Sequence, residues 1–268
     1  LTFAGAVALA ANASVTAGGP IAFTSTVDGA RRLTVSSGRG IAFTGAVGGT
    51  TPLQGVTVTR AQSVAARNAF SLDGAGAGPG ANGLVIGRNV DNVVIASAPG
   101  TISGFSGSGI LFVGGSTGSQ IRNLTLSGNG TGITAGPGFY TGTAIAGNTI
   151  TTSQGDGISL VDAKSLTIGG GSAAGGNLIV SNGGFGIANS GNCSFSYVNG
   201  NEIAGNAIGA IQGFLNSDLR RSGVVLCSTG LLVALSTLGR ASYLTQKLGV
   251  YRFDAEFSAN DVTMTSSG

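Results

Sequence analysis

The chain has 268 residues, with 50 glycines, 5 prolines, 9% charged residues and a formal net charge of +3. The glycines follow no Gly-X-Y period, which excludes collagen, and a hydrophobic content of 42% excludes a disordered chain. The basic residues are scattered and form no stripe interleaved with aromatic residues, so we expect no nucleic-acid partner.

Residues 1–59 repeat with a fixed step of about 20 residues, which is typical of an array whose units bury their apolar face only by stacking. The triplets that end in Phe3, Phe23 and Phe43 are equally spaced, and each leads to a valine. Alternating apolar residues between Gly-rich breaks indicate short strands, so the pattern predicts an all-β solenoid. We expect the three phenylalanines to form a stacked ladder in the core.

The segments IAFTSTVDG and IAFTGAVGGTTPLQGVTVT resemble the passenger repeats of large bacterial surface proteins of the filamentous-haemagglutinin and autotransporter type. This resemblance covers approximately residues 1–60. It implies a right-handed, single-stranded parallel β-helix, secretion, and an adhesive or structural role. The chain starts with Leu1 at the first position of a repeat, so we expect it to be a processed or trimmed piece of something longer.

Residues 60–83 interrupt the period. The stretch RAQSVAAR, residues 60–67, could form a short helical turn, and GAGAGPGANG, residues 74–83, predicts a turn-rich loop. We interpret 60–83 as a loop or insertion between two solenoid sections. It does not resemble a phosphate-binding loop, because no helix follows and the nearest downstream basic residue is Arg88.

Residues 84–213 form a second array with a looser period of about 24 residues. Its unit is Gly-Asn, an apolar pair, a Gly-rich corner and then Gly-Ile. Successive units carry one equivalent aliphatic residue each, separated by unequal steps: Leu126, Ile150, Ile179 and Ile203. We expect an amide ladder of the stacked residues Asn148, Asn177 and Asn201. This section resembles the right-handed β-helix of the pectate-lyase-like superfamily, and with the first array it predicts about a dozen turns.

The tail, residues 214–268, differs from both arrays. Its apolar stretch, residues 224–238, is shorter than the roughly 20 residues of a membrane helix, so we expect buried strands and no membrane span. We interpret the tail as irregular closing turns or a segment that packs on the solenoid. Cys193 and Cys227 could form a disulfide in an oxidising compartment or be two buried small residues.

Candidate catalytic residues are few. The chain has no histidine and no Cys-X-X-Cys motif, so we expect no metal site and no cofactor. One weak cluster could serve a polysaccharide-degrading enzyme: Asp156, Asp162, Lys164 and Glu202. Its spacing does not force these side chains onto one face, and we interpret them as solvated corner residues. We therefore expect no enzyme.

These patterns favour a structural or adhesive protein, extracellular or on the cell surface. A solenoid end exposes unpaired strand edges, and Leu1, Thr2 and Phe3 lie in such an edge without a charged or proline gatekeeper. We therefore expect self-association, with copies added head to tail as a filament. The alternative is a β-helix that binds surface glycans or degrades polysaccharides.

Overall fold

The computed structural model describes residues 1–96, 100–170, 175–191 and 196–212, except for the side chain of Asn199. Beyond these it describes only the backbone of four strands. The described residues form strands joined by corners, and they contain no helix long and apolar enough to cross a membrane.

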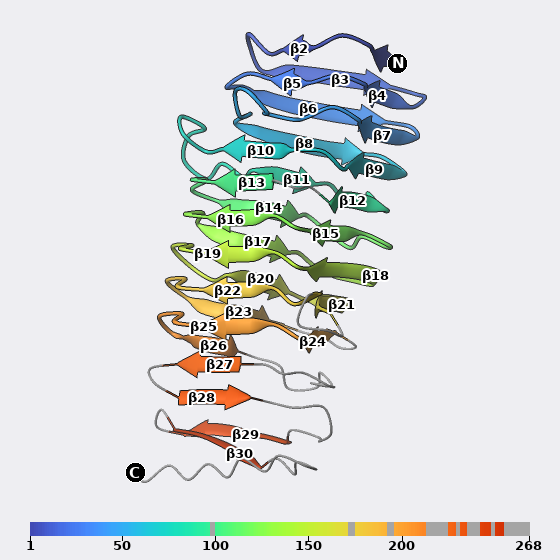
Figure 1. Cartoon of the computed structure of the whole chain (residues 1–268). Coiled ribbons are helices and arrows are strands. Elements are labelled where there is room, and N and C mark those ends of the chain that lie inside the picture. The colour runs from blue at the N-terminus through green and yellow to red at the C-terminus, as the bar shows by residue number, and fades with distance from the viewer. Residues whose placement is uncertain are drawn as a thin grey trace.

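Three sheets make up the solenoid, and their strands pair in parallel apart from the last pair of sheet B (Figure 1). Sheet A has nine strands: β1 (Thr2–Phe3), β4 (Ile21–Phe23), β7 (Gly40–Phe43), β9 (Ser63–Ala66), β12 (Val93–Ala96), β15 (Gln120–Arg122), β18 (Gly138–Ala146), β21 (Ala163–Gly169) and β24 (Tyr197–Asn199).

Sheet B begins with the pair β2 (Val7–Ala8) and β5 (Val27–Asp28), which single bridges at Val47 connect to the rest. The remaining strands are β10 (Phe70–Asp73), β13 (Gly100–Ser103), β16 (Thr125–Ser127), β19 (Thr149–Thr151), β22 (Leu178–Val180), β25 (Glu202–Ala204), β27 (Val225–Ser228) and β28 (Leu231–Ala234).

Sheet C also has nine strands: β3 (Ala13–Ala17), β6 (Arg32–Ser37), β8 (Gly55–Arg60), β11 (Leu84–Ile86), β14 (Ser108–Phe112), β17 (Thr131–Ala135), β20 (Ile158–Val161), β23 (Phe185–Ser190) and β26 (Gly209–Gln212).

The chain visits sheets A, B and C in turn and then climbs to the next level, which makes a right-handed parallel β-helix as the repeats predict. One such turn is called a rung here. Sheets A and C contain nine strands each, so the described solenoid has nine rungs and eight full turns between the first and the last. The expectation of about a dozen was too high for the described residues. Every turn after the first two is longer than the turns of the first repeats, and residues 213–268, which the expectation included, lie largely outside the described part. A short turn separates the paired residues Ile21 and Ile41, and a much longer one separates Ile168 and Val198.

The segment 60–83 is not an insertion throughout. Strand β8 runs to Arg60, β9 pairs with β7 and β12, and β10 follows at once, so only 74–83 is a loop. The expected helical turn at 60–67 is wrong. Val64 and Ala66 are buried while Ser63 and Ala65 point outward, and this period of two belongs to a strand.

The tail lies largely outside the described residues. In its apolar stretch, β27 pairs parallel with β25 and antiparallel with β28. Further on, β29 (Ser242–Lys247) and β30 (Val250–Asp254) pair antiparallel.

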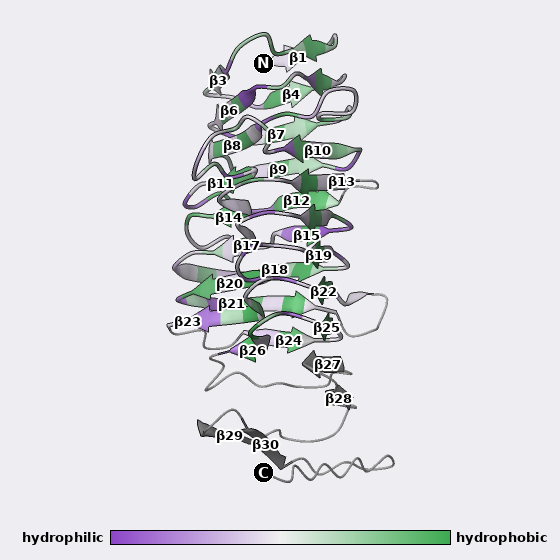
Figure 2. Cartoon of the chain, turned by 90° about the vertical axis from the view of Figure 1, so that its left-hand side faces the viewer, coloured by the Kyte–Doolittle hydropathy of each residue, from purple (hydrophilic) through white to green (hydrophobic). Residues whose placement is uncertain are grey.

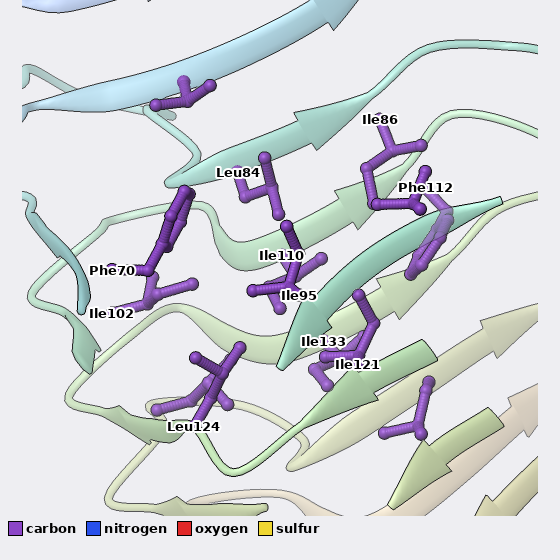
Figure 3. Close-up of a cluster of buried hydrophobic side chains, with 14 of the residues drawn as sticks. Phe70, Leu84, Ile86, Ile95, Ile102, Ile110, Phe112, Ile121, Leu124 and Ile133 are labelled. Atoms are coloured by element: carbon purple, nitrogen blue, oxygen red, sulfur yellow. The ribbon is translucent and has the colours of Figure 1, made fainter. Parts of the chain in front are cut away.

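The core is a column of aliphatic and aromatic side chains enclosed by the three sheets. Hydrophobic residues recur along β4, β7 and β12 of sheet A (Figure 2). Figure 3 shows Ile95 and Ile121 of sheet A meeting Ile110 and Ile133 of sheet C, and all four are fully buried. Each such side chain contributes about 1.5–3 kcal/mol on burial, so the stacked interior holds the rungs together.

Candidate functional site

The phenylalanine ladder forms in sheet A. Phe3 pairs with Phe23, and Phe23 with Phe43, in direct register. The ring centroids lie 4.8 and 5.0 Å apart with interplanar angles of 5° and 4°. Phe23 and Phe43 are buried, so this ladder belongs to the core and leaves no aromatic platform for a ligand.

The asparagine ladder forms at the corner between sheets A and B. Asn148 Nδ2 donates to Asn177 Oδ1 at 2.9 Å, and Asn177 Nδ2 donates to Asn201 Oδ1 at 2.8 Å. Each backbone N–H of Asn148 and Asn177 also donates to the same oxygen of the next rung. The glycine before Asn148, Gly147, has φ 65°, a left-handed conformation that makes this corner tight.

A second ladder, at the corner between sheets B and C, was not expected. Asn182 Nδ2 donates to Asn206 Oδ1 at 2.8 Å, and the backbone N–H of Ser153 donates to Asn182 Oδ1 at 2.9 Å. Asn129 occupies the equivalent corner one rung before Ser153 and donates to the Ile102 carbonyl at 2.9 Å. A signal existed in the sequence, because the step from Asn182 to Asn206 equals the step from the ladder residue Asn177 to Asn201.

The weak acidic cluster is not brought together. Asp156 lies at the corner between β19 and β20, whereas Asp162 and Lys164 lie beyond the far end of β20. Six residues of extended chain span about 20 Å, and the two carboxyl groups of a glycosidase lie within about 9.5 Å. Glu202 lies in sheet B, in line with Leu178. These residues therefore occupy different sides of the solenoid.

Two of these residues, Asp156 and Lys164, have a defined local contact. Asp156 Oδ1 accepts a hydrogen bond from the Phe185 N–H at 2.8 Å, which joins two corner loops. Lys164 Nζ lies 5.3 Å from the centroid of the Phe139 ring. Among the described residues, no group of three or more histidine, cysteine, aspartate or glutamate residues could hold a metal ion.

One exposed aromatic residue marks the corner between sheets C and A. Phe139 is 61% exposed, while its neighbour Tyr140 is buried and anchors the segment through its hydroxyl, 2.8 Å from the Gly114 carbonyl oxygen. Burial raises the pKa of Tyr140. The exposed Arg88 packs beside Gly114 at the same corner. Arg88, Phe139 and Lys164 therefore lie in successive order along this corner.

The first rung carries glycines at the same positions as the rungs that follow it. A Cβ added to Gly38 or Gly45 would meet backbone atoms of the preceding rung at 2.2 and 2.3 Å. The equivalent positions of the first rung are Gly18 and Gly5, and a Cβ there would meet nothing within 4 Å. Gly18 and Gly5 thus repeat, in the rung that contains Leu1, Thr2 and Phe3, the small residues at which the described rungs stack closely.

Of the two cysteines, Cys193 lies outside the described residues, and Cys227 lies in β27, whose side chains are also outside them. Both alternatives for this pair, a disulfide or two buried small residues, stay predictions.

Comparison with known proteins gives one match. A family model described as "Right handed beta helix region" matches residues 54–224, well over half of the 268 residues. No curated protein and no solved structure matches the chain.

Proposed function

The chain belongs to the right-handed β-helix family, and on this premise we propose that it is an extracellular structural or adhesive β-solenoid whose first rung joins copies head to tail. It is proposed to act as a rigid surface segment without catalytic activity. The resemblance of residues 1–59 to passenger repeats of bacterial surface proteins supports this location.

The geometry suits a rigid spacer. Nine rungs at about 4.8 Å extend the described solenoid by roughly 40 Å. Ladders of hydrogen-bonded asparagine and stacked phenylalanine connect successive rungs inside, and the surface carries few charges. A stack of this kind resists bending and proteolysis because its backbone groups are paired between rungs.

The single observation that carries the self-association is that Gly5 and Gly18 repeat in the first rung the glycines at which interior rungs stack closely. At the corresponding positions, Gly45 of the third rung and Gly38 of the second each lie against a preceding rung. The first rung thus has the small residues that close stacking needs, and β1–β3 lie at one end of the stack (Figure 1). In the proposed assembly, strands of a second copy pair in parallel with β1–β3.

Head-to-tail docking joins two different surfaces, so it does not close on itself and propagates as a filament. The strands of the incoming copy continue the parallel direction of sheets A and C. Unpaired strand edges are sites where such addition occurs unless they are blocked.

The test uses the chain of residues 1–268 at increasing concentration, with light scattering and negative-stain electron microscopy. We expect filaments. Gly18→Leu should abolish them without disturbing the fold, because no atom lies within 4 Å of the added Cβ. Thr167→Leu, on the outer face of sheet A, is the matched control and should assemble like the parent chain. Dispersed monomers of the parent chain at every concentration would refute the docking.

Glycan binding is a second candidate function, favoured by the corner at Phe139. A ring that is 61% exposed can stack on the apolar face of a sugar, and Lys164 Nζ lies 5.3 Å from its centroid. Because Asp156, Asp162 and Glu202 do not converge, this candidate is binding without cleavage. Loss of signal on a glycan array for Phe139→Ala, with Tyr197→Ala as a control, would support it; an unchanged signal would exclude this corner.

A further inference from the structure

Three successive rungs of sheet B carry the same short pattern of hydroxyl, aliphatic, hydroxyl. The central residues Ile102, Leu126 and Ile150 are fully buried, and the residues on either side point outward. The outward residues are Thr101 and Ser103 in β13, Thr125 and Ser127 in β16, and Thr149 and Thr151 in β19.

These six residues form a two-by-three lattice, here called the hydroxyl lattice. Thr101 pairs with Thr125 and Thr125 with Thr149, and the second row pairs equally directly with no shift in register. Neighbouring strands lie about 4.8 Å apart, and alternate residues of one strand about 6.7 Å apart. The hydroxyls are therefore ordered in two directions.

The hydroxyl lattice is free of protein partners. Within the part of the chain that the structure describes, none of the six side-chain hydroxyls makes a hydrogen bond to another protein group. The buried hydroxyl of Ser116 behaves differently, because its Oγ donates to the Val90 carbonyl at 2.7 Å. The six outward hydroxyls thus bind solvent or an external partner.

The lattice is also held rigidly. Four of its six residues are threonines, whose β-branched side chains have restricted χ1 angles, and a packed aliphatic column lies directly beneath. The three lattice strands pair without a shift in register, and in the first three rungs the stacked phenylalanine rings of sheet A deviate from parallel by only 5° and 4°. Ordinary sheets rotate by about 20° or more per strand, and such a rotation would destroy a flat lattice.

We propose that the hydroxyl lattice binds crystalline water, that is, the surface of ice. Each hydroxyl anchors a first-layer water, and anchoring in two fixed directions orders these waters into rows that can merge with a crystal plane. The lattice itself contains no charged side chain that would impose its own hydration shell. It also contains no aromatic ring, the group that would stack on the sugars of a crystalline polysaccharide.

The borders of the lattice define its extent. In the preceding rung the outward pair is Ser71 and Asp73, and in the following rung it is Leu178 and Val180. Sheet C has outward hydroxyls too, on β3, β6 and β8. Its register shifts after Val35, and the charged Arg32 lies in the same strand, so no regular lattice forms there.

The experiment measures incorporation of the labelled chain into a slowly growing ice hemisphere and inhibition of ice recrystallisation. The chain should enter the ice and keep the crystals small. Thr125→Lys places a charge at the centre of the lattice, and we expect loss of both effects. Thr167→Lys places the same charge on sheet A and should leave both unchanged. Circular dichroism and thermal unfolding establish that both variants fold.

A gain-of-function variant makes the test independent of loss by misfolding. Leu178→Thr with Val180→Thr extends the lattice by one rung, and we expect stronger inhibition than that of the parent chain. Exclusion of the parent chain from ice, or full activity of Thr125→Lys, would overturn the proposal. Retention on microcrystalline cellulose that Thr125→Lys abolishes, without entry into ice, would assign the lattice to a polysaccharide and also overturn it.

Discussion

Asn177 donates a hydrogen bond from Nδ2 to Asn201 Oδ1 at 2.8 Å, and its backbone N–H donates to the same oxygen at 3.0 Å. Its other Nδ2 hydrogen bond goes to the Ile145 carbonyl, and its own Oδ1 accepts two hydrogen bonds from Asn148. This buried side chain therefore connects three consecutive rungs at one corner. The ladder satisfies corner N–H groups that the sheets themselves do not pair.

Replacing Asn177 by alanine should destabilise the solenoid by about 2–4 kcal/mol, because the backbone N–H and the Nδ2 of Asn148 and the Ile145 carbonyl each lose a buried hydrogen-bond partner. Asn12→Ala is the matched control. Asn12 is exposed and accepts one hydrogen bond, from the Arg32 N–H, so we expect about 0.5–1 kcal/mol. Urea unfolding followed by circular dichroism measures both. Equal effects of the two substitutions would contradict the role of burial.

The first three rungs could be predicted in detail from the sequence, because turns of equal length put Phe3, Phe23 and Phe43 in register without knowledge of the corners. The number of rungs could not be predicted in this way. Corner loops of variable length make the later turns unequal, so dividing the chain by an average period gives the wrong number of rungs. The helical turn predicted at 60–67 is wrong for a different reason. The alanines of this stretch favour a helix locally, but Val64 and Ala66 are buried in the aliphatic core, and this burial favours a strand.

The candidate site shows the same division. Asn148, Asn177 and Asn201 were predictable because Gly-Asn recurs before each apolar pair. The second ladder was missed because Ser153 interrupts the series of asparagines between Asn129 and Asn182. Asp156 and Asp162 are close in sequence, but a strand separates them, so they lie at different corners of the solenoid. Proximity along the chain therefore says little about a shared face.

Ser153 is a gap in the second ladder, and filling it should stabilise the protein. Its Oγ is buried and has no hydrogen-bond partner. An asparagine at position 153 would repeat the geometry of Asn182, whose Nδ2 donates to a carbonyl of the preceding rung, that of Ile150. We expect Ser153→Asn to raise the free energy of unfolding by about 1 kcal/mol.

Ser153→Ala serves as the comparison for this substitution. It removes only an unpaired hydroxyl, so we expect a change near zero. Thermal and urea unfolding of the two variants give the difference. A less stable Ser153→Asn than Ser153→Ala would mean that the corner cannot hold the larger side chain.

The phenylalanine ladder predicts a graded series. Phe23 is buried between two rings, so Phe23→Ala should cost about 3–5 kcal/mol through lost burial and the cavity it leaves. Phe3 stacks on one ring only and is partly exposed, so Phe3→Ala should cost about 1–2 kcal/mol. Each rung of a solenoid is stabilised by its nearest neighbours, so Phe23→Ala weakens the contacts with both adjacent rungs. A larger loss for Phe3→Ala in urea unfolding would contradict this ranking.

Tyr140 predicts a loss of stability in alkali. Burial raises the pKa of its phenol above the ordinary value of 10.0, because the charged phenolate would be desolvated in the core. The neutral phenol is therefore favoured by the fold, and its contribution is complete below pH 10. Above pH 10 the unfolded chain ionises while the folded chain does not, so stability should fall by up to about 1.4 kcal/mol per pH unit.

Tyr140→Phe separates this effect from the other titrating groups. The variant loses the hydroxyl, which lies 2.8 and 2.9 Å from the Gly114 and Gly136 carbonyl oxygens, so at neutral pH we expect it to be less stable by about 1–3 kcal/mol. As the pH rises above 10, the parent chain loses its advantage and the two unfolding free energies converge. The control Tyr197→Phe changes an exposed ring and leaves Tyr140 in place, so it should retain the loss of stability above pH 10. A constant gap between the parent and Tyr140→Phe across this range would mean that the phenol ionises equally in the folded and unfolded chain.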